Sequence, residues 1–354
     1  MRPGKLPESH LKRSVLRKLN KQNALVKGHP ELGMDAVRLD INGLVTAQAV
    51  VELPVKYPAK LAVIKAMNNL LAGGGHPTGI TLTLLVPESA KETTVRSLEE
   101  EAGAQAACYG DVGIMGGDVR VSPSVSVPVV MVTAYGTPVG MIGQQVLCEL
   151  KPDMDIVMTK WIAMEATWLM AENCRDDLHN RYADAYIDNG LEFGEHLSVA
   201  PEIAVLNEME LFARHDASYG GIFGCLWELL EPSGLGCQVE ISQIPVKQES
   251  IEFAEYYNVN PYMLSGGGSL LAVVPDGRQV VDALGEKDIF SAVIGHTTKD
   301  KARAVLTPLP LEEDAIDPAK TRRRHEAEVR YLVPGQSDEL FRILYEHSHL
   351  SKMK

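Results

Sequence analysis

Short apolar runs that alternate with helical patterns restrict the fold of this chain most strongly. The runs at residues 80–86 and 270–274 are rich in branched apolar side chains and are short enough to be buried strands. Between them, apolar residues recur every three or four positions. This pattern is clearest at 60–71, where glycines and a proline then end it. Strands that alternate with helices predict sheets packed against helices around apolar cores.

The first half of the chain predicts an α+β unit, a mixed sheet with helices on one face. Asn42-Gly43 separates two apolar runs, and this dipeptide is a strong hairpin signal. We expect a basic amphipathic helix at 8–20, strands at 36–40, 44–51, 80–86, 112–115 and 125–134, and helices at 60–71 and 88–107. The last two strands are expected to flank a turn that contains the Gly-Gly-Asp sequence.

The second half predicts a separate unit of strands and helices. A turn-rich passage at 136–153 precedes it, and 354 residues are more than one core usually absorbs. We expect strands at 156–159 and 270–274 and helices at 162–178, 202–213, 222–230 and 337–347. The predicted division is an N-terminal domain at 1–145, a C-terminal domain at 146–310 and a tail with a helix at 311–354.

Charge and composition exclude several classes of function. The chain carries 34 lysines and arginines against 47 aspartates and glutamates, and this net charge of −13 disfavours non-specific nucleic-acid binding. A nucleotide is still compatible, because backbone N–H groups and a divalent cation can hold phosphates. There is no secretory apolar region and no membrane-length apolar stretch, so we expect a cytoplasmic protein that does not associate with membranes. The five cysteines are scattered and predict neither a disulfide framework nor a structural zinc site.

The segment HDASYGG at 215–221 carries the strongest chemical signal. Ser218 suits a helix N-cap, and Gly220 and Gly221 leave backbone N–H groups open at the start of the following helix. Free amides and the helix dipole together form an anion site, and Asp216 would hold a cation that bridges to phosphate. The alternative is an ordinary helix start whose glycines serve close packing.

Three further segments are weaker on their own. Paired glycines and an aspartate occur in the sequence GIMGGD, which contains Gly116, Gly117 and Asp118, and Met34-Asp35 follows a glycine before an apolar run. Asn68 and Asn69 end the predicted helix at 60–71. Their amide oxygens would coordinate a divalent cation or bond a ribose, although such residues are as often simple C-caps.

The order and spacing of these segments resemble the AIR synthase-like superfamily. That group includes aminoimidazole ribonucleotide synthase, selenophosphate synthetase, thiamine-monophosphate kinase and HypE-type hydrogenase-maturation proteins. GMDAVRL resembles G-D-D-A-A-V, AMNNLLAGGGHP resembles A-x-N-D-x-x-A-x-G-A-x-P, and GIMGGDV resembles G-G-D-T. HDASYGGIFGCLWELLEPSGLG resembles H-D-x-S/T-x-G-G-L followed by E-x-A-x-x-S-G-x-G, and VPGQSDELFRIL is similar to the HypE-like C-terminal order. The resemblance spans about residues 4–347.

The resemblance implies a homodimer in which the N-terminal sheets pair into a β-barrel beside a C-terminal α/β sandwich. It implies ATP in the cleft between the halves, with Mg²⁺ on aspartates, and phosphorylation or activation of an oxygen or amide of a small acceptor. Asp35, Asp118 and Asp216 match metal ligands, and His215 and Asp216 are the catalytic candidates. The implied nucleotide-binding residues are Asp35, Gln48, Asn68, Asn69, Gly116, Gly117, Asp118, Lys160, Glu165, Ser218, Gly220 and Gly221.

Departures from the family pattern leave two main readings open. Met34, Gln48 and Asn69 stand where the family has aspartates, so we expect a weak or single Mg²⁺ site. The chain ends HSHLSKMK, without the cysteine that a HypE-type enzyme uses as carbamoyl carrier, so cyanide-ligand synthesis on this tail is not expected. The first reading is an ATP-using enzyme with another acceptor. The alternative is a non-catalytic, nucleotide- or ligand-binding dimeric scaffold or regulator, linked to hydrogenase maturation, and a minor third reading is an enzyme outside ATP chemistry.

Overall fold

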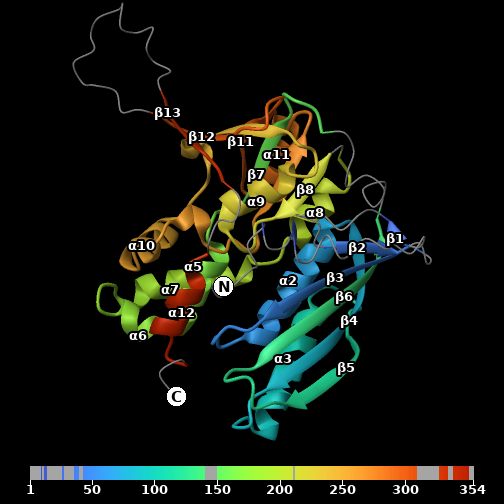
Figure 1. Cartoon of the computed structure of the whole chain (residues 1–354), viewed down its shortest axis with the longest axis vertical. Coiled ribbons are helices and arrows are strands. Elements are labelled where there is room, and N and C mark those ends of the chain that lie inside the picture. The colour runs from blue at the N-terminus through green and yellow to red at the C-terminus, as the bar shows by residue number, and fades with distance from the viewer. Residues whose placement is uncertain are drawn as a thin grey trace, which may run out of the picture.

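The chain forms two sheets, each packed against helices (Figure 1). The structure is a computed structural model that describes residues 9, 12–13, 26–27, 36–39, 43–139, 150–209, 212–308, 327–333 and 338–350. The helix expected at 8–20 falls almost wholly outside these residues, and so does Asp35. Within the described residues, no helix combines the length and the apolar character needed to cross a membrane.

The N-terminal sheet has six strands in the order β1-β2-β3-β6-β4-β5. Its strands are β1 (Val26–Lys27), β2 (Ala36–Leu39), β3 (Leu44–Val51), β4 (Gly75–Val86), β5 (Ile114–Val121) and β6 (Val129–Pro138), and its helices are α2 (Pro58–Ala72) and α3 (Glu92–Ala107). Alternate residues of β3, such as Val45 and Ala47, are buried in the core that α2 and α3 share, while Gln48 and Val50 are exposed. The predicted hairpin at Asn42-Gly43 and the one-sided cover of helices are therefore confirmed.

The expected turn at Gly-Gly-Asp is wrong. Gly116, Gly117 and Asp118 lie inside β5, which pairs in parallel with β4 along its whole length. All eight residues of β5 are exposed, so the strand has no buried face that the apolar pattern would have revealed. Strand β5 forms because it pairs with β4, which lies about 30 residues earlier in the sequence.

The C-terminal sheet has seven strands in the order β13-β12-β9-β11-β7-β10-β8. These strands are β7 (Asp155–Thr159), β8 (Ala213–Asp216), β9 (Gly236–Glu240), β10 (Leu270–Val274), β11 (Ser291–Thr298), β12 (Arg303–Pro308) and β13 (Ala327–Tyr331). Helix α9 (Gly221–Leu230) packs on one face with Ile156 and Met158, and α8 (Ala200–Leu206) and α11 (Gly277–Gly285) pack on the other with Val157. Because both faces are covered, β10 is apolar at every position, as the sequence predicted.

Two helix predictions in this half need correction. The helix expected at 202–213 ends at Leu206, and Ala213–Asp216 is instead the strand β8, which pairs with the outer edge of β10. The helix expected at 162–178 is divided at Cys174 into α5 (Met164–Asn173) and α6 (Arg175–Leu178). Only Ala213 of the first predicted helix falls in β8, and its pairing with Val273 of β10 is a distant contact that a local helical pattern does not encode.

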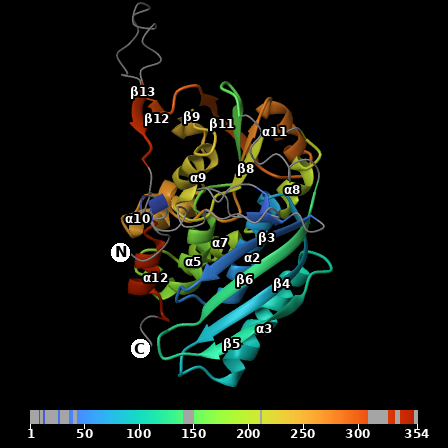
Figure 2. The ribbon, with the colours of Figure 1, turned by 45° about the vertical axis from the view of Figure 1, so that its right-hand side comes forward.

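A group of helices joins the two halves. It comprises α5, α6, α7 (Asp184–Glu192), α10 (Gln248–Tyr256) and α12 (Leu340–His347), and short 3₁₀ turns lie at η3 (Phe193–Glu195), η4 (Ile241–Gln243) and η5 (Pro261–Met263). One core cluster contains residues of α2 and β3 together with residues of α5, α7, α10 and α12. Figure 2 shows these helices beside the N-terminal sheet and below the C-terminal sheet. The buried core thus runs across the boundary expected near residue 145.

Candidate functional site

One cleft of about 340 Å³ lies between the two halves of the chain. The first half contributes the end of β3 and one side of α2, and the second half contributes α5, the start of α9 and the start of α12. The lining residues are Gln48, Ala49, Val50, Val51, Glu52, Leu53, Leu61, Lys65, Asn69, Glu165, Ser218, Tyr219, Ser265, Asp338, Leu340 and Phe341. Four residues expected at a nucleotide site, Gln48, Asn69, Glu165 and Ser218, therefore meet in this cleft.

The wall from the first half is the end of β3. Among the described strands, β2 pairs with β3 only as far as Ala47, so the edge of β3 from Gln48 onward faces the cleft. The side-chain amide of Asn69 donates to the backbone carbonyl of Gln48 at 3.4 Å. The alternation of β3 places the Gln48 side chain on the exposed face of the sheet, so Gln48 meets Asn69 through its backbone.

An ion pair crosses the cleft between the halves. The ammonium of Lys65 in α2 donates to both carboxylate oxygens of Glu165 in α5, at 2.6 and 2.8 Å. The side chain of Glu165 is 2% exposed and that of Lys65 is 21% exposed, so the cation is the more accessible partner. Sequence reasoning missed Lys65. It lies four residues before Asn69, a spacing that places both on one helix face, and this was the available signal.

The start of α9 forms the wall from the second half. Gly220 and Gly221 have φ of 81° and 63°, a backbone conformation that favours glycine. A Cβ on Gly221 would lie 2.5 Å from the carbonyl oxygen of Tyr262, so this glycine also permits close packing against η5. The glycines therefore serve close packing, and Ser218 and Tyr219 just before α9 line the cleft.

A carboxylate of the chain itself lies against this first turn. Asp338 accepts hydrogen bonds from the Ser265 hydroxyl at 2.5 Å and from the Leu340 N–H at 3.0 Å. Burial raises the pKa of Asp338 to about 6, against the opposing effect of the Ser265 hydrogen bond. Ser265 and Asp338 were not predicted, because only the tertiary structure brings α12 to α9.

Two predicted binding residues have structural partners elsewhere. The Asn68 amide donates to the Leu197 carbonyl at 2.8 Å and accepts from the Val199 N–H at 3.1 Å. The Lys160 ammonium pairs with Glu202 at 2.8 Å and donates to two backbone carbonyls. Neither side chain lines the cleft, so both serve to fix the segment before α8.

The catalytic candidates lie behind the cleft wall, at the buried end of β8. The Nδ1 atom of His215 is 2.7 Å from the backbone oxygen of Asp216 and 3.8 Å from the Cys225 sulfur, and its Nε2 atom is 3.7 Å from Glu228. Burial raises the pKa of the Cys225 thiol. Asp216 is 2% exposed, and neither it nor His215 is among the lining residues.

The glycine-aspartate segment of β5 lies at the outer edge of the N-terminal sheet, at the bottom of Figure 1. Asp118 is exposed and pairs with Arg120 at 2.6 Å, and this hydrogen bond holds the pKa of the carboxyl below its usual range. Asp118 and Asp216 therefore belong to edge strands of different sheets. Among the described residues, no group of three histidines, cysteines or carboxylates is placed to hold a metal ion.

Two family models match the chain in succession. The AIR synthase related protein N-terminal domain matches residues 32–137, and the corresponding C-terminal domain matches residues 175–306. The chain belongs to the AIR synthase related proteins. Its mixed α+β fold with two sheets is the one that the sequence predicted for this family.

Relatives of this AIR synthase related chain include carbamoyl dehydratase HypE of Rhodobacter capsulatus. The two are 24% identical over 242 residues, which cover 66% of this chain and 67% of the relative. Among solved structures, HypE in complex with ATP gives a TM-score of 0.62 at 18% identity and covers 92% of this chain and 93% of its own. AaThiL complexed with AMPPCP and TMP gives a TM-score of 0.65 at 16% identity, and the match covers 88% of this chain and 97% of AaThiL. At these identities the two structures establish the shared fold.

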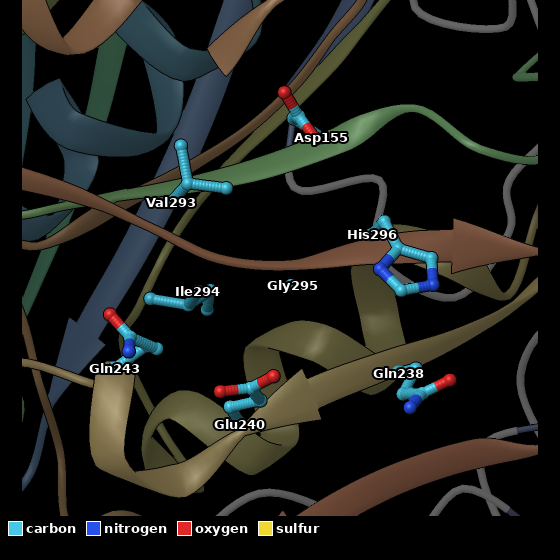
Figure 3. Close-up of a pocket in the computed structure, with 8 residues that line it drawn as sticks. All are labelled: Asp155, Gln238, Glu240, Gln243, Val293, Ile294, Gly295 and His296. Carbon is cyan, nitrogen blue, oxygen red and sulfur yellow. The ribbon is translucent and has the colours of Figure 1, made fainter. Parts of the chain in front are cut away.

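A second cavity of about 290 Å³ lies over the C-terminal sheet of the AIR synthase related fold. Its lining comes from β7, β9, β11 and η4, and it includes Asp155, Glu240 and His296. Figure 3 shows these polar side chains spread around the rim, with Asp155 and Glu240 on opposite sides. It contains none of the residues expected from the family resemblance, and Asp155 already accepts from the Gly277 N–H at 2.8 Å. The cleft between the halves is therefore the candidate site.

Exchanging Gly117 for alanine is expected to release β5 from the sheet. A Cβ at this position would lie 1.7 Å from the backbone oxygen of Leu82 on β4, so the strands must separate, at a cost of about 2–3 kcal/mol. Hydrogen exchange should show faster exchange of the β5 amides, and thermal unfolding should show a lower midpoint. Gly116→Ala is the matched control, because a Cβ there meets nothing within 4 Å. Equal protection of β5 in both variants would contradict the close contact.

Proposed function

We propose that the chain binds ATP in the cleft between its halves and uses it to phosphorylate, and so activate, an oxygen or amide of a small acceptor. One observation carries the proposal. The cleft gathers the end of β3, Asn69, Glu165 and the start of α9 from both halves, and places the cation Lys65 among them. HypE and AaThiL, which share the fold, have been solved with ATP and with AMPPCP, and this supports a nucleotide as the ligand.

The residues of the cleft divide into two chemical roles. Backbone groups at the edge of β3, the amide of Asn69 and the apolar side chains Leu53 and Leu61 suit a base and ribose. Lys65 and the Ser218 hydroxyl, which precedes α9, suit the phosphates, because an ammonium and a hydroxyl donor both stabilise negative charge. In the reaction, Lys65 would orient the phosphates and offset the charge that develops as the terminal phosphoryl group departs.

The described residues of one chain do not fit a Mg²⁺ site. Asp118 and Asp216 lie on different sheets, and the carboxylate of Glu165 is held by Lys65. Mg²⁺, when present, would therefore arrive with the phosphates of the nucleotide. We propose only a weak or single metal site, in keeping with the amides at Gln48 and Asn69.

We also propose a homodimer through the N-terminal sheet. Strand β5 is an edge strand whose side chains are all exposed, and Ile114, Met115, Val119 and Val121 make it apolar. Such an edge pairs readily with another strand, and a second copy would cover it. The position of Gly116 and Asp118 on this strand would then place them at the dimer contact rather than in the cleft of their own chain.

A specific observation favours a second candidate, a nucleotide-binding scaffold or regulator without turnover. The cation of the cleft is bound by Glu165, no group of three histidines, cysteines or carboxylates is placed to hold a metal ion among the described residues, and both catalytic candidates are buried. Each of these features is compatible with nucleotide binding, and none of them provides a catalytic group. Any link of this scaffold to hydrogenase maturation rests on the relationship to HypE.

Titration calorimetry with ATP, in Mg²⁺ and in EDTA, tests the proposal together with a phosphate-release assay. We expect ATP binding in both solutions and slow release of phosphate in Mg²⁺. Asn69→Leu should weaken ATP binding about fivefold to tenfold, because one hydrogen-bonding group is lost. Glu240→Gln, in the second cavity, is the matched control and should bind as the unaltered protein does.

The outcomes separate the candidates. Binding without phosphate release, with and without Mg²⁺, would support the regulator. Absence of ATP binding, or equal weakening by Asn69→Leu and Glu240→Gln, would overturn the proposed site.

A further inference from the structure

The strand β13 ends the C-terminal sheet. It pairs with β12 on one side, and among the described strands nothing pairs with its other side. It lies along the left border of the ribbon in Figure 2, at the opposite end of the sheet from β8. Ala327 is half-buried and the other four residues of the strand are exposed. An edge of this kind offers a row of backbone donors and acceptors to another strand.

The ladder between β12 and β13 fixes which backbone groups face outward. The N–H of Leu332, directly after β13, donates to the carbonyl of Arg303 in β12 at 2.8 Å. In an antiparallel ladder the hydrogen-bonding groups of successive residues point to opposite sides of the strand. The N–H and C=O groups of Ala327, Val329 and Tyr331 therefore point away from β12, toward the open edge.

The side chains of β13 divide into a charged face and an apolar face. Glu328 and Arg330 lie on one face, where the Arg330 guanidinium is 6.0 Å from the centre of the Phe223 ring and is still exposed. Val329 and Tyr331, which are 46% and 62% exposed, lie on the other face. The two charges have opposite signs and stand at equal distances on either side of Val329, so the strand complements a reversed copy of itself.

We propose that β13 pairs in antiparallel fashion with β13 of a second copy of this chain, about a twofold axis at Val329. In this register Val329 lies opposite Val329 of the other copy, and the outward backbone groups of Ala327 and Tyr331 bond each other across the axis. Glu328 of each copy lies opposite Arg330 of the other, so both charge pairs are favourable. The two C-terminal sheets then form one continuous sheet.

The charges select this register among the symmetric ones. The axis must pass through a residue, because directly opposed side chains share one face of the sheet. An axis at Glu328 or at Arg330 places like charges opposite each other, which is destabilising. An axis at Tyr331 puts Arg330 opposite the apolar Leu332 and leaves Glu328 without a cation. Of these axes, the one at Val329 opposes each charge to its complement.

The contact is small, so we expect an association that depends on protein concentration. It involves five residues of each copy, whereas a standard interface has about 20–30 residues a side. It does not involve the nucleotide cleft, and it lies on the other sheet from β5, the strand proposed for the N-terminal dimer. A chain that uses both contacts would form assemblies larger than a dimer.

Exchange of the two charges tests the pairing by sedimentation velocity over a wide range of protein concentrations. Glu328→Arg and Arg330→Glu each place like charges at both opposed positions, and we expect either variant to weaken the association about tenfold. The double exchange in one chain restores opposite charges and should restore the association. Arg278→Glu, at an exposed position in the first turn of α11, is the matched control and should associate as the unaltered protein does.

A mixture of the two single variants gives the sharpest readout. Glu328→Arg carries two cations on β13 and Arg330→Glu carries two carboxylates, so an equimolar mixture opposes unlike charges at both positions although each variant alone is repelled. Each exchange alters the net charge of −13 by only two, so both proteins stay strongly negative and general attraction does not arise. We expect the mixture to associate about tenfold more strongly than either variant alone.

Hydrogen exchange locates the contact on the unaltered protein. The outward amides of Val329 and Tyr331 should gain protection as the protein concentration rises. Equal association of all the proteins, or a mixture that associates no better than its components, would overturn the pairing; both results are expected if another protein or another segment of this chain covers β13. These outcomes leave the nucleotide site standing, and absence of ATP binding leaves the pairing standing.

Discussion

Replacing Lys160 by methionine is expected to destabilise the protein by about 3–5 kcal/mol. The ammonium of Lys160 pairs with Glu202 at 2.8 Å and donates to the carbonyl oxygens of His196 and Ser198, each at 2.8 Å. The side chains of Lys160 and Glu202 are 8% and 1% exposed. Methionine keeps the shape of the stem but leaves a buried carboxylate and two carbonyls without their cation. Urea unfolding followed by circular dichroism should show the midpoint move to lower denaturant.

The control for this prediction removes both charges. Lys160→Met combined with Glu202→Leu leaves no unpaired charge, and we expect it to recover much of the stability that the single variant loses. Burial lowers the pKa of the Lys160 ammonium and the carboxylate of Glu202 opposes that shift, so the pair is a structural unit in which each charge needs the other. If Lys160→Met lowers the free energy of unfolding by less than about 1 kcal/mol, the ion pair contributes no more than an exposed pair does. That result would show that this pair does not stabilise the fold.

The sequence carried most information where burial leaves a pattern in the local sequence. Strand β3 buries alternate residues, and α2 and β10 are buried along most of their length, so the apolar residues of all three could be read locally. Strand β5 buries nothing, and it exists because β4 pairs with it. Strand β8 likewise forms on the free edge of β10, and no local pattern encodes that pairing.

The same distinction applies to the candidate site. The residues Asn69, Glu165 and Ser218 were identified through motifs that the family shares, and they meet in the cleft. Lys65 and Asp338 were missed, because each acts through a contact with a residue far away in the sequence. The ion pair between two helices and the hydrogen bond from Ser265 to Asp338 can be seen only in the folded chain.

Lys65 and Glu165 are expected to have opposite effects on ATP binding when each is replaced. Lys65→Met removes the only lysine or arginine among the described residues that line the cleft and leaves the carboxylate of Glu165 facing the ligand. We expect ATP affinity to fall about 100-fold, in line with the loss of one partner of a buried charge pair. Glu165→Gln instead frees the ammonium for phosphate and removes one negative charge, so affinity should rise by about fivefold to tenfold. Titration calorimetry with ATP in EDTA measures both changes.

A double variant separates binding from folding. Glu165 is almost fully buried, so Lys65→Met alone should also lower the thermal midpoint, whereas Lys65→Met with Glu165→Leu should restore stability without restoring ATP affinity. The sign of the Glu165→Gln effect is decisive. If Glu165 itself holds the nucleotide or its cation, as the family resemblance implies, then both single variants weaken binding. If the pair serves only to join α2 to α5, both variants lose stability and leave ATP affinity unchanged. Opposite signs arise only when the phosphates and Glu165 compete for Lys65.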